Sequence, residues 1–229
     1  MKGIHRLRPH TPRRAKPVVP ALLSSIAGVL DPGDSLYQAT FACSLLLFHT
    51  LARLGSVLPA SLRTKPQFFL SRDCVNSSAE GMLVTMLHTK TIQFGERLLH
   101  IPLVRTGGIL CPVQAFQRHL SLLGSLTSMK AATPAFLYKD SASRLRWLTG
   151  SKFISTFRAL AIRAGDHEGA AYSGHSFRRG GASWAFKAGV PGELIQILGD
   201  WSSDAYKRYL EFDMKNKLAL SARFSRKVP

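Results

Sequence analysis

One apolar stretch limits most strongly how this chain can fold. Its large apolar residues recur at helical spacing: Leu36, Phe41, Leu45, Phe48 and Leu51. This spacing predicts a helix from about Ser35 to Gly55, and its apolar content indicates that the helix lies in the core. The turn residues Asp31-Pro32-Gly33-Asp34 precede it and should end a first short helix over Ala21–Leu30.

The pattern changes between Pro66 and Val104, where short apolar runs alternate with polar turns. The runs are Phe68–Ser71, Met82–Leu87 and Leu98–Val104, and the turns are Asn76-Ser77-Ser78 and Gln93-Phe94-Gly95-Glu96. They predict a small antiparallel sheet, with Lys90 on the hairpin between the last two strands. Further helices are expected over 112–123, 150–164, 176–188, 192–198 and 203–212. The predicted fold class is mainly α with a small antiparallel β-sheet (α+β).

The length and the apolar content predict one substantial core. The chain has 229 residues, of which 45% are hydrophobic. Residues 1–20 carry six Lys or Arg, four prolines and no acid, so we expect an extended, mobile basic arm or interdomain linker. Residues 21–213 form the expected domain. Residues 214–229 form a basic tail, which is either solvated or packed on a neighbouring subunit.

The charge favours a polyanionic partner. The formal net charge is +18, from 31 Lys and Arg against 13 Asp and Glu. The longest apolar run, Phe41–Phe48, is too short to span a bilayer, so no membrane partner is expected. Three widely spaced cysteines form no metal-ligand or disulfide pattern, which predicts a reduced, intracellular, metal-free protein. The cluster Arg13-Arg14-Ala15-Lys16 is either a nuclear-targeting signal or one of many ordinary basic clusters.

A phosphate-binding cluster is predicted near the C-terminus, in Gly174-His175-Ser176-Phe177-Arg178-Arg179-Gly180-Gly181. If a helix begins near His175, its free N–H groups and dipole favour an anion, and His175, Arg178 and Arg179 share one side. Trp184 lies on another side and is expected in the core. For each residue alone, a capping histidine or solvated arginines are the commoner explanation. Trp201 and Tyr209 nearby, with Arg53 and Lys90 upstream, favour a phosphoryl-transfer site.

From about Pro17 to Phe212 the chain resembles the tyrosine recombinase (phage integrase) family, particularly the recombinases of Crypton-like and DIRS-like mobile elements. The family's catalytic domains present an arginine, a hairpin lysine, an HxxR motif, a His or Trp and a nucleophilic tyrosine in that order. The matching residues here are Arg53, Lys90, His175, Arg178, Trp201 and Tyr209. The resemblance implies the catalytic-domain fold of that family.

The resemblance also implies an enzyme that cleaves and rejoins DNA strands in recombination or integration. Tyr209 would attack a phosphorus to give a 3′-phosphotyrosyl link and a free 5′-hydroxyl, with no cofactor. Arg53 and Arg178 would neutralise the nonbridging oxygens, and Lys90 would protonate the leaving oxygen. His175 would assist proton transfer from the tyrosine, and Trp201 would hydrogen-bond the phosphate or buttress the site. The implied partners are DNA and further copies in a synaptic assembly.

Several alternatives stay open from the sequence. Tyr206 lies nearly on the same helical side as Tyr209, and Arg179 competes with Arg178, although the family spacing favours Tyr209 and Arg178. Ser56 stands where many members carry an acid, and the family's N-terminal helical DNA clamp is not expected in this chain. A catalytically inactive DNA-binding remnant and a type IB topoisomerase are the alternative functions. A nuclear location is expected if the organism is eukaryotic.

Overall fold

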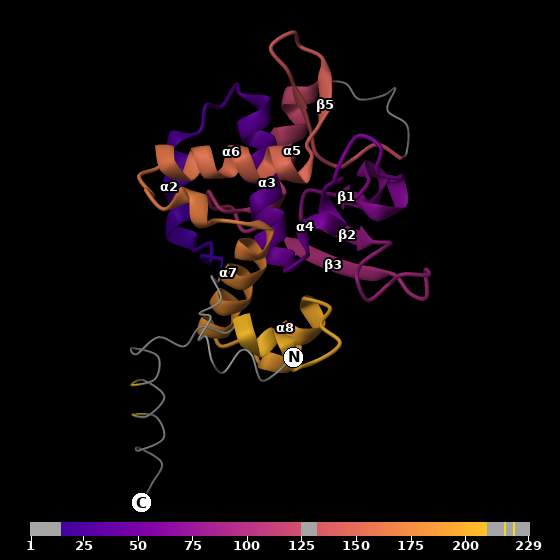
Figure 1. The fold of residues 1–229 in the computed structure, drawn as a ribbon, viewed down its shortest axis with the longest axis vertical. Coiled ribbons are helices and arrows are strands. Elements are labelled where there is room, and N and C mark those ends of the chain that lie inside the picture. The colour runs from indigo at the N-terminus through magenta and orange to yellow at the C-terminus, as the bar shows by residue number, and fades with distance from the viewer. Residues whose placement is uncertain (1–14, 125–131, 210–217, 219–221, 223–229) are drawn as a thin grey trace, which may run out of the picture.

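The computed structural model describes residues 15–124, 132–209, 218 and 222, without the side chains of 208 and 209. Helices make up about half of this part, and a small three-stranded sheet lies to one side of them (Figure 1). The predicted α+β class is therefore confirmed. The tail residues from 210 onward lie outside the described part except for 218 and 222. Among the described residues, no helix is both long and apolar enough to cross a membrane.

The centre of the fold is α3, Ser35–Thr50, nearly all of whose side chains are buried. Asp34 caps it by accepting hydrogen bonds from the Leu36 and Tyr37 N–H groups at 2.8 and 3.0 Å. Three further helices pack on it: α5 (Pro112–Leu123), α6 (Gly150–Arg163) and α7 (Gly174–Lys187). The first helix, α2 (Pro20–Val29), packs on α6. The predicted core helix is thus the element around which the others assemble.

The three-stranded sheet is antiparallel, in the order β1 (Val75–Ser77), β2 (Gly81–Met86) and β3 (Leu99–Val104). Its buried side chains alternate along β2 and β3, so one face packs against the core. A separate hairpin joins β4 (Leu137–Lys139) to β5 (Leu145–Trp147). The cysteines Cys43, Cys74 and Cys111 are free and buried.

Two local predictions in the sheet region are wrong. Phe68–Ser71 is not a strand: Phe68 is the last residue of a 3-10 helix, η1 (Pro66–Phe68), and within the segment only Ser71 forms a single bridge, to Pro134. Asn76-Ser77-Ser78 is not simply a turn, because Asn76 and Ser77 belong to β1 and pair with β2. Whether each of these two segments forms a strand depends on pairing with a neighbouring strand rather than on its composition.

The predicted helix over Ser35–Gly55 is interrupted. Leu51 ends α3 in the left-handed conformation, with φ of 54°, and a short helix, α4 (Leu54–Val57), follows. Arg53 occupies the position just before α4 and is half-buried. It is therefore neither a buried arginine of a core helix nor a solvated arginine at a frayed end.

The glycine pair of α7 allows two very close approaches of backbone. A Cβ built on Gly181 would lie 2.1 Å from the Phe48 carbonyl oxygen of α3, and one on Gly180 would lie 1.8 Å from the Val18 carbonyl oxygen. Any larger residue would force these segments apart. Trp184, which was expected in the core, is 50% exposed, so that prediction is wrong. α7 turns its glycine face inward and leaves the indole on the outside.

The residues before α2 pack on the domain. The Val18 N–H donates to the Ser176 carbonyl at 3.0 Å, and the Val18 side chain is fully buried. The Lys16 ammonium pairs with Asp166 at 3.0 Å and with Glu168 at 2.8 Å. The expected mobility is therefore wrong for residues 15–19, while the rest of the predicted arm, with Arg13 and Arg14, lies outside the described residues.

Candidate active site

One cleft of about 540 Å³ brings together side chains from distant parts of the sequence. Four of the residues that line it are predicted site residues: Arg53, Lys90, His175 and Arg178. Arg53 precedes α4, Lys90 lies on the β2–β3 hairpin, and the other two lie on the first turns of α7. The described residues that line the cleft include no carboxylate. This arrangement suits an anion with several oxygens.

Arg53 is available to such an anion. Its side chain is half-buried, and it forms no ion pair or side-chain hydrogen bond with the residues that the structure describes. Ser56, which stands where an acid is common in the resembled family, is nearly buried and lines the same cleft. The guanidinium therefore faces the cleft without a neighbouring carboxylate on α4 to compete for it.

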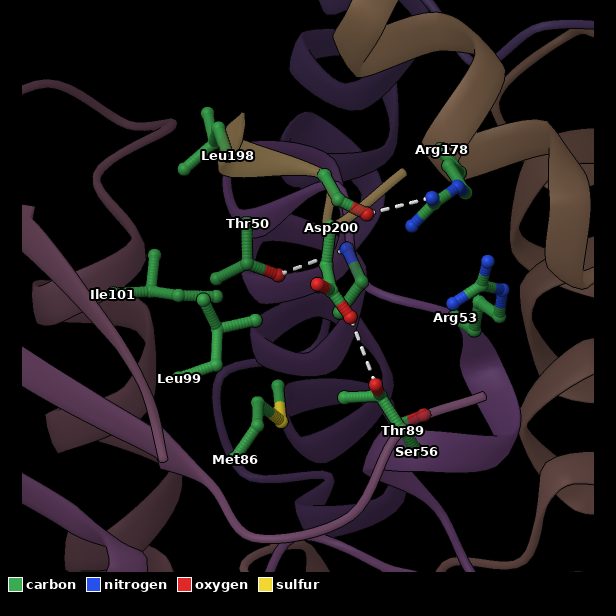
Figure 2. Close-up of a pocket in the computed structure, with 12 residues that line it drawn as sticks. Thr50, Arg53, Ser56, Met86, Thr89, Leu99, Ile101, Arg178, Leu198 and Asp200 are labelled. Carbon is green, nitrogen blue, oxygen red and sulfur yellow. Dashed lines mark hydrogen bonds between the residues drawn. The ribbon is translucent and has the colours of Figure 1, made fainter. Parts of the chain in front are cut away.

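Arg178 has a different environment. It is only 2% exposed, and its guanidinium donates to the carbonyl oxygens of Leu51 and of Gly199, the latter at 2.6 Å. Arg178 also lines a small void of about 10 Å³, about the volume that one water needs. Figure 2 shows residues that line this void, with Arg178 on one side of it. Arg178 thus lines the cleft while joining the ends of α3 and α8 (Gly192–Leu198).

His175 is exposed and lines the cleft, but part of the helix start that was expected to be free for an anion is bonded within the chain. The His175 N–H donates to the Ser173 hydroxyl at 3.3 Å, and Ser173 and Ser176 form a reciprocal capping box. An anion in the cleft would therefore meet the His175 side chain, while the N–H groups of His175 and Ser176 are already used within the chain. Arg179 does not line the cleft: it donates to the Ala15 carbonyl at 2.7 Å.

Trp201 lies behind Arg178 and does not line the cleft. Its ring centroid is 3.6 Å from the guanidinium carbon of Arg178, and the residue is 8% exposed. It belongs to a second cluster of buried residues: Leu51, Ala182, Ile195, Trp201 and Tyr206. Of the two roles expected for the indole, its position suits the buttress.

Of the two candidate tyrosines, the structure describes the side chain of Tyr206 but not that of Tyr209. Tyr206 is 4% exposed and its ring centroid lies 6.2 Å from that of Trp201, so it is a packed residue. Both tyrosines lie in the 3-10 helix η4 (Asp204–Tyr209), which takes the place of the predicted helix over 203–212 up to its last described residue. The Tyr209 side chain lies outside the described part.

Two residues beside the cleft were missed by sequence reasoning. His88 lines it and packs edge-on against Phe68, with ring centroids 4.7 Å apart. Asp200 accepts hydrogen bonds from the hairpin that carries Lys90. Neither had a distinguishing signal, since a lone histidine or acid next to a turn is usually solvated. Within the described residues, no group of three or more His, Cys, Asp or Glu could hold a metal ion.

Comparison with solved structures finds the same fold at low sequence identity. The chain matches the XerH site-specific recombinase bound to difH substrate in a pre-cleavage complex, with a TM-score of 0.61 and 12% identity over 90% of this chain and 53% of that chain. For the XerA recombinase the TM-score is 0.61 at 15% identity, over 98% and 68% of the two chains. For the Tn1549 transposon integrase in complex with transposon right end DNA it is 0.57 at 17%, over 94% and 67%.

These similarities establish the fold. The chain has the catalytic-domain fold of tyrosine recombinases, and it spans about half the length of the XerH chain. No family model matches the sequence, and no curated protein matches it.

Proposed function

We propose that this chain is the catalytic domain of a tyrosine recombinase or integrase, which breaks and rejoins DNA strands for a mobile element of the Crypton-like or DIRS-like kind. One observation carries the proposal. Arg53, Lys90, His175 and Arg178 line a single cleft in which the described residues include no carboxylate. The formal net charge of +18 supports DNA as the partner.

In the proposed reaction the Tyr209 oxygen attacks the phosphorus, and the bond from phosphorus to the 5′-oxygen breaks. His175 takes up the phenolic proton, and Lys90 supplies the proton that the leaving 5′-oxygen needs. Arg53 places its guanidinium on a nonbridging oxygen, where negative charge grows in the transition state. Loss of one such donor typically costs on the order of 3 kcal/mol of barrier.

Arg178 and Trp201 complete the proposed site from behind. The Arg178 guanidinium is already bonded to two carbonyl groups, so it adds a fixed positive charge at the back of the cleft. Trp201 stacks under that charge and holds it in place. A charge that is fixed before the substrate binds needs no reorganisation during the reaction.

Trapping of a covalent adduct tests this proposal. The 229-residue chain is incubated with a pool of nicked duplexes of randomised sequence, and adducts that survive denaturation are counted. The wild type and Tyr206→Phe should form adducts, because Tyr206 is packed and loses only its hydroxyl, whereas Tyr209→Phe should form none. Equal amounts of adduct from the wild type and Tyr209→Phe would show that Tyr209 is not the nucleophile.

The second candidate function is a DNA-binding remnant without activity. The use of Arg178 by two carbonyl groups favours it, because two of the five N–H donors of this guanidinium then serve the fold rather than a phosphate. Such a protein would retain DNA with an affinity that falls steeply as salt rises, yet would form no adduct with any nicked duplex.

A further inference from the structure

Asp200 ties the Lys90 hairpin to the end of α8. Its Oδ2 atom accepts hydrogen bonds from the Thr89 hydroxyl, at 2.8 Å, and from the Thr91 hydroxyl. Its Oδ1 atom pairs with the guanidinium of Arg97, on the returning arm of the hairpin. Figure 2 shows the carboxylate pointing to Thr89. One carboxylate therefore binds the residues on both sides of Lys90, more than a hundred positions away in the sequence.

The backbone of Asp200 is unusual for a residue with a side chain. Its φ is 54°, in the left-handed region that glycine normally occupies. Two hydrogen bonds, from Asp200 N–H to the Ile197 carbonyl and from Trp201 N–H to the Gln196 carbonyl, both 3.1 Å, close the end of α8. They form a Schellman motif, whose left-handed position is usually glycine. Glycine would avoid the conformational strain at this position. The presence of an aspartate in spite of that strain favours a role for its carboxylate.

The Asp200 carboxylate is nearly buried and is ionised. Its side chain is 10% exposed. Burial alone would raise the pKa of this carboxyl, but the hydrogen bonds from Thr91, Arg97 and Thr89 outweigh burial and hold the pKa below its ordinary value. The negative charge is therefore stable at neutral pH, and its hydrogen-bond and ion-pair partners among the described residues lie on the hairpin.

The hairpin turn makes Lys90 depend on these bonds. Thr89 and Ile92 exchange two backbone hydrogen bonds, of 3.0 and 3.3 Å, so Lys90 and Thr91 form the tip of a tight turn. Thr89 is buried at 5% exposure, whereas Lys90 is exposed and lines the cleft. The turn can move away from the cleft only if its threonines leave the carboxylate.

We propose that Asp200 is a positioning residue that holds Lys90 at the cleft, so that the ammonium can protonate the leaving oxygen. This inference rests on the proposed function, because it assigns Asp200 no role except through Lys90. It makes two separable claims: the carboxylate fixes the hairpin, and the fixed hairpin is needed for proton transfer by Lys90.

Hydrogen exchange tests the first claim without DNA. Asp200→Gly removes the carboxylate and relieves the left-handed backbone, so it should not unfold α8, and Asp200→Asn keeps the shape but loses the charge. Asp140→Asn is the matched control, since Asp140 pairs with Arg144 and Arg146 in the β4–β5 hairpin, away from the cleft. The hydrogen-bonded amides of Thr89, Thr91 and Ile92 should exchange at least about tenfold faster in both Asp200 variants, and their exchange should be unchanged in the control. Unchanged exchange in both variants would overturn the inference.

A change of leaving group tests the second claim. In DNA with a 5′-bridging sulfur, the phosphorus–sulfur bond breaks and a thiolate leaves, which needs no proton because thiols are much more acidic than alcohols. With ordinary DNA, Lys90→Ala and Asp200→Gly should each lose about a hundredfold in the rate of adduct formation, within the usual range for general acid catalysis. With the sulfur substrate, both should come within about threefold of the wild type.

The outcomes separate the inference from the proposed function. If the wild type forms adducts but sulfur rescues Lys90→Ala and not Asp200→Gly, Asp200 does not act through Lys90 and the inference is wrong. If the wild type forms no adduct with either substrate, the proposed function fails, and faster exchange in Asp200→Gly would still support the hairpin clamp by itself.

Discussion

The guanidinium of Arg178 lies over the indole of Trp201, with 3.6 Å between its central carbon and the ring centroid. The same guanidinium donates to the carbonyl groups of Leu51 and Gly199, at the ends of α3 and α8. Arg178 therefore joins three helices at one point, since it is itself part of α7. A residue expected to serve only the reaction also serves the fold.

The first prediction separates this structural role from the role of Arg53. Arg178→Met should lower the free energy of unfolding by about 3 kcal/mol, because two buried carbonyl groups lose a charged donor. Arg53→Met should change it by less than about 0.5 kcal/mol, because its side chain bonds to no other described residue. Urea unfolding measures both variants. If the two variants lost similar amounts of unfolding free energy, the different environments described for Arg178 and Arg53 would be contradicted.

The second prediction concerns two tryptophans, Trp184 on α7 and Trp201 just after α8. Trp201→Ala should cost about 3 kcal/mol or more, because it opens a cavity in a buried cluster and removes the ring under Arg178. Trp201→Phe should recover most of that loss. Trp184→Ala is the matched control and should cost less than about 1 kcal/mol, since the ring is 50% exposed. An equal cost at both positions, measured by urea unfolding, would argue against the second cluster.

The third prediction tests the close approach of α7 to α3. Gly181→Ala should destabilise the protein by about 2 kcal/mol or more, because the new methyl group would meet the Phe48 carbonyl oxygen at 2.1 Å. Gly28→Ala, inside α2 with nothing within 4 Å of the new atom, should instead stabilise it by about 0.5 to 1 kcal/mol. Thermal unfolding measures the two stability changes, which should have opposite signs. If Gly181→Ala stabilised the protein, the close packing of α7 on α3 would be ruled out.

The sequence predicted the helices well because periodic apolar residues encode them directly. α5 and α8 begin and end at the predicted residues, 112–123 and 192–198. The interruption after Leu51 was missed, because no glycine or proline marks it. A left-handed leucine is tolerated there since its carbonyl accepts from Arg178, a partner that lies 127 positions away. Such a break depends on tertiary contacts and has no local signal.

The site was predicted only in part, because some of its residues have a local sequence signal and others do not. Its cations have recognisable spacing, and the structure brings Arg53, Lys90, His175 and Arg178 to one cleft. Asp200 was missed, because an acid at a helix end is an ordinary surface residue in a sequence. Its importance depends on the three hairpin donors, Thr89, Thr91 and Arg97, which become neighbours only when the chain folds.

The last prediction concerns His119, which is fully buried on α5 and stacks on Phe136 with ring centroids 5.7 Å apart. Burial lowers the pKa of its imidazole from 6.5 to about 4, and the nearby Arg72 cation acts in the same direction, while a backbone interaction with Ala135 opposes them only in part. The unfolded chain therefore binds a proton below pH 6.5 that the folded protein does not take up.

This difference makes the folded protein less stable in acid. The contribution of His119 is complete above pH 6.5, falls as the pH drops toward 4, and then levels off. The total loss is about 3 kcal/mol, since each pKa unit corresponds to about 1.4 kcal/mol. Urea unfolding from pH 7.5 to 4 measures it. His119→Leu should lose about that much less stability over this range than the wild type. If the wild type and His119→Leu lose stability in parallel, the buried imidazole is not the source of the acid sensitivity.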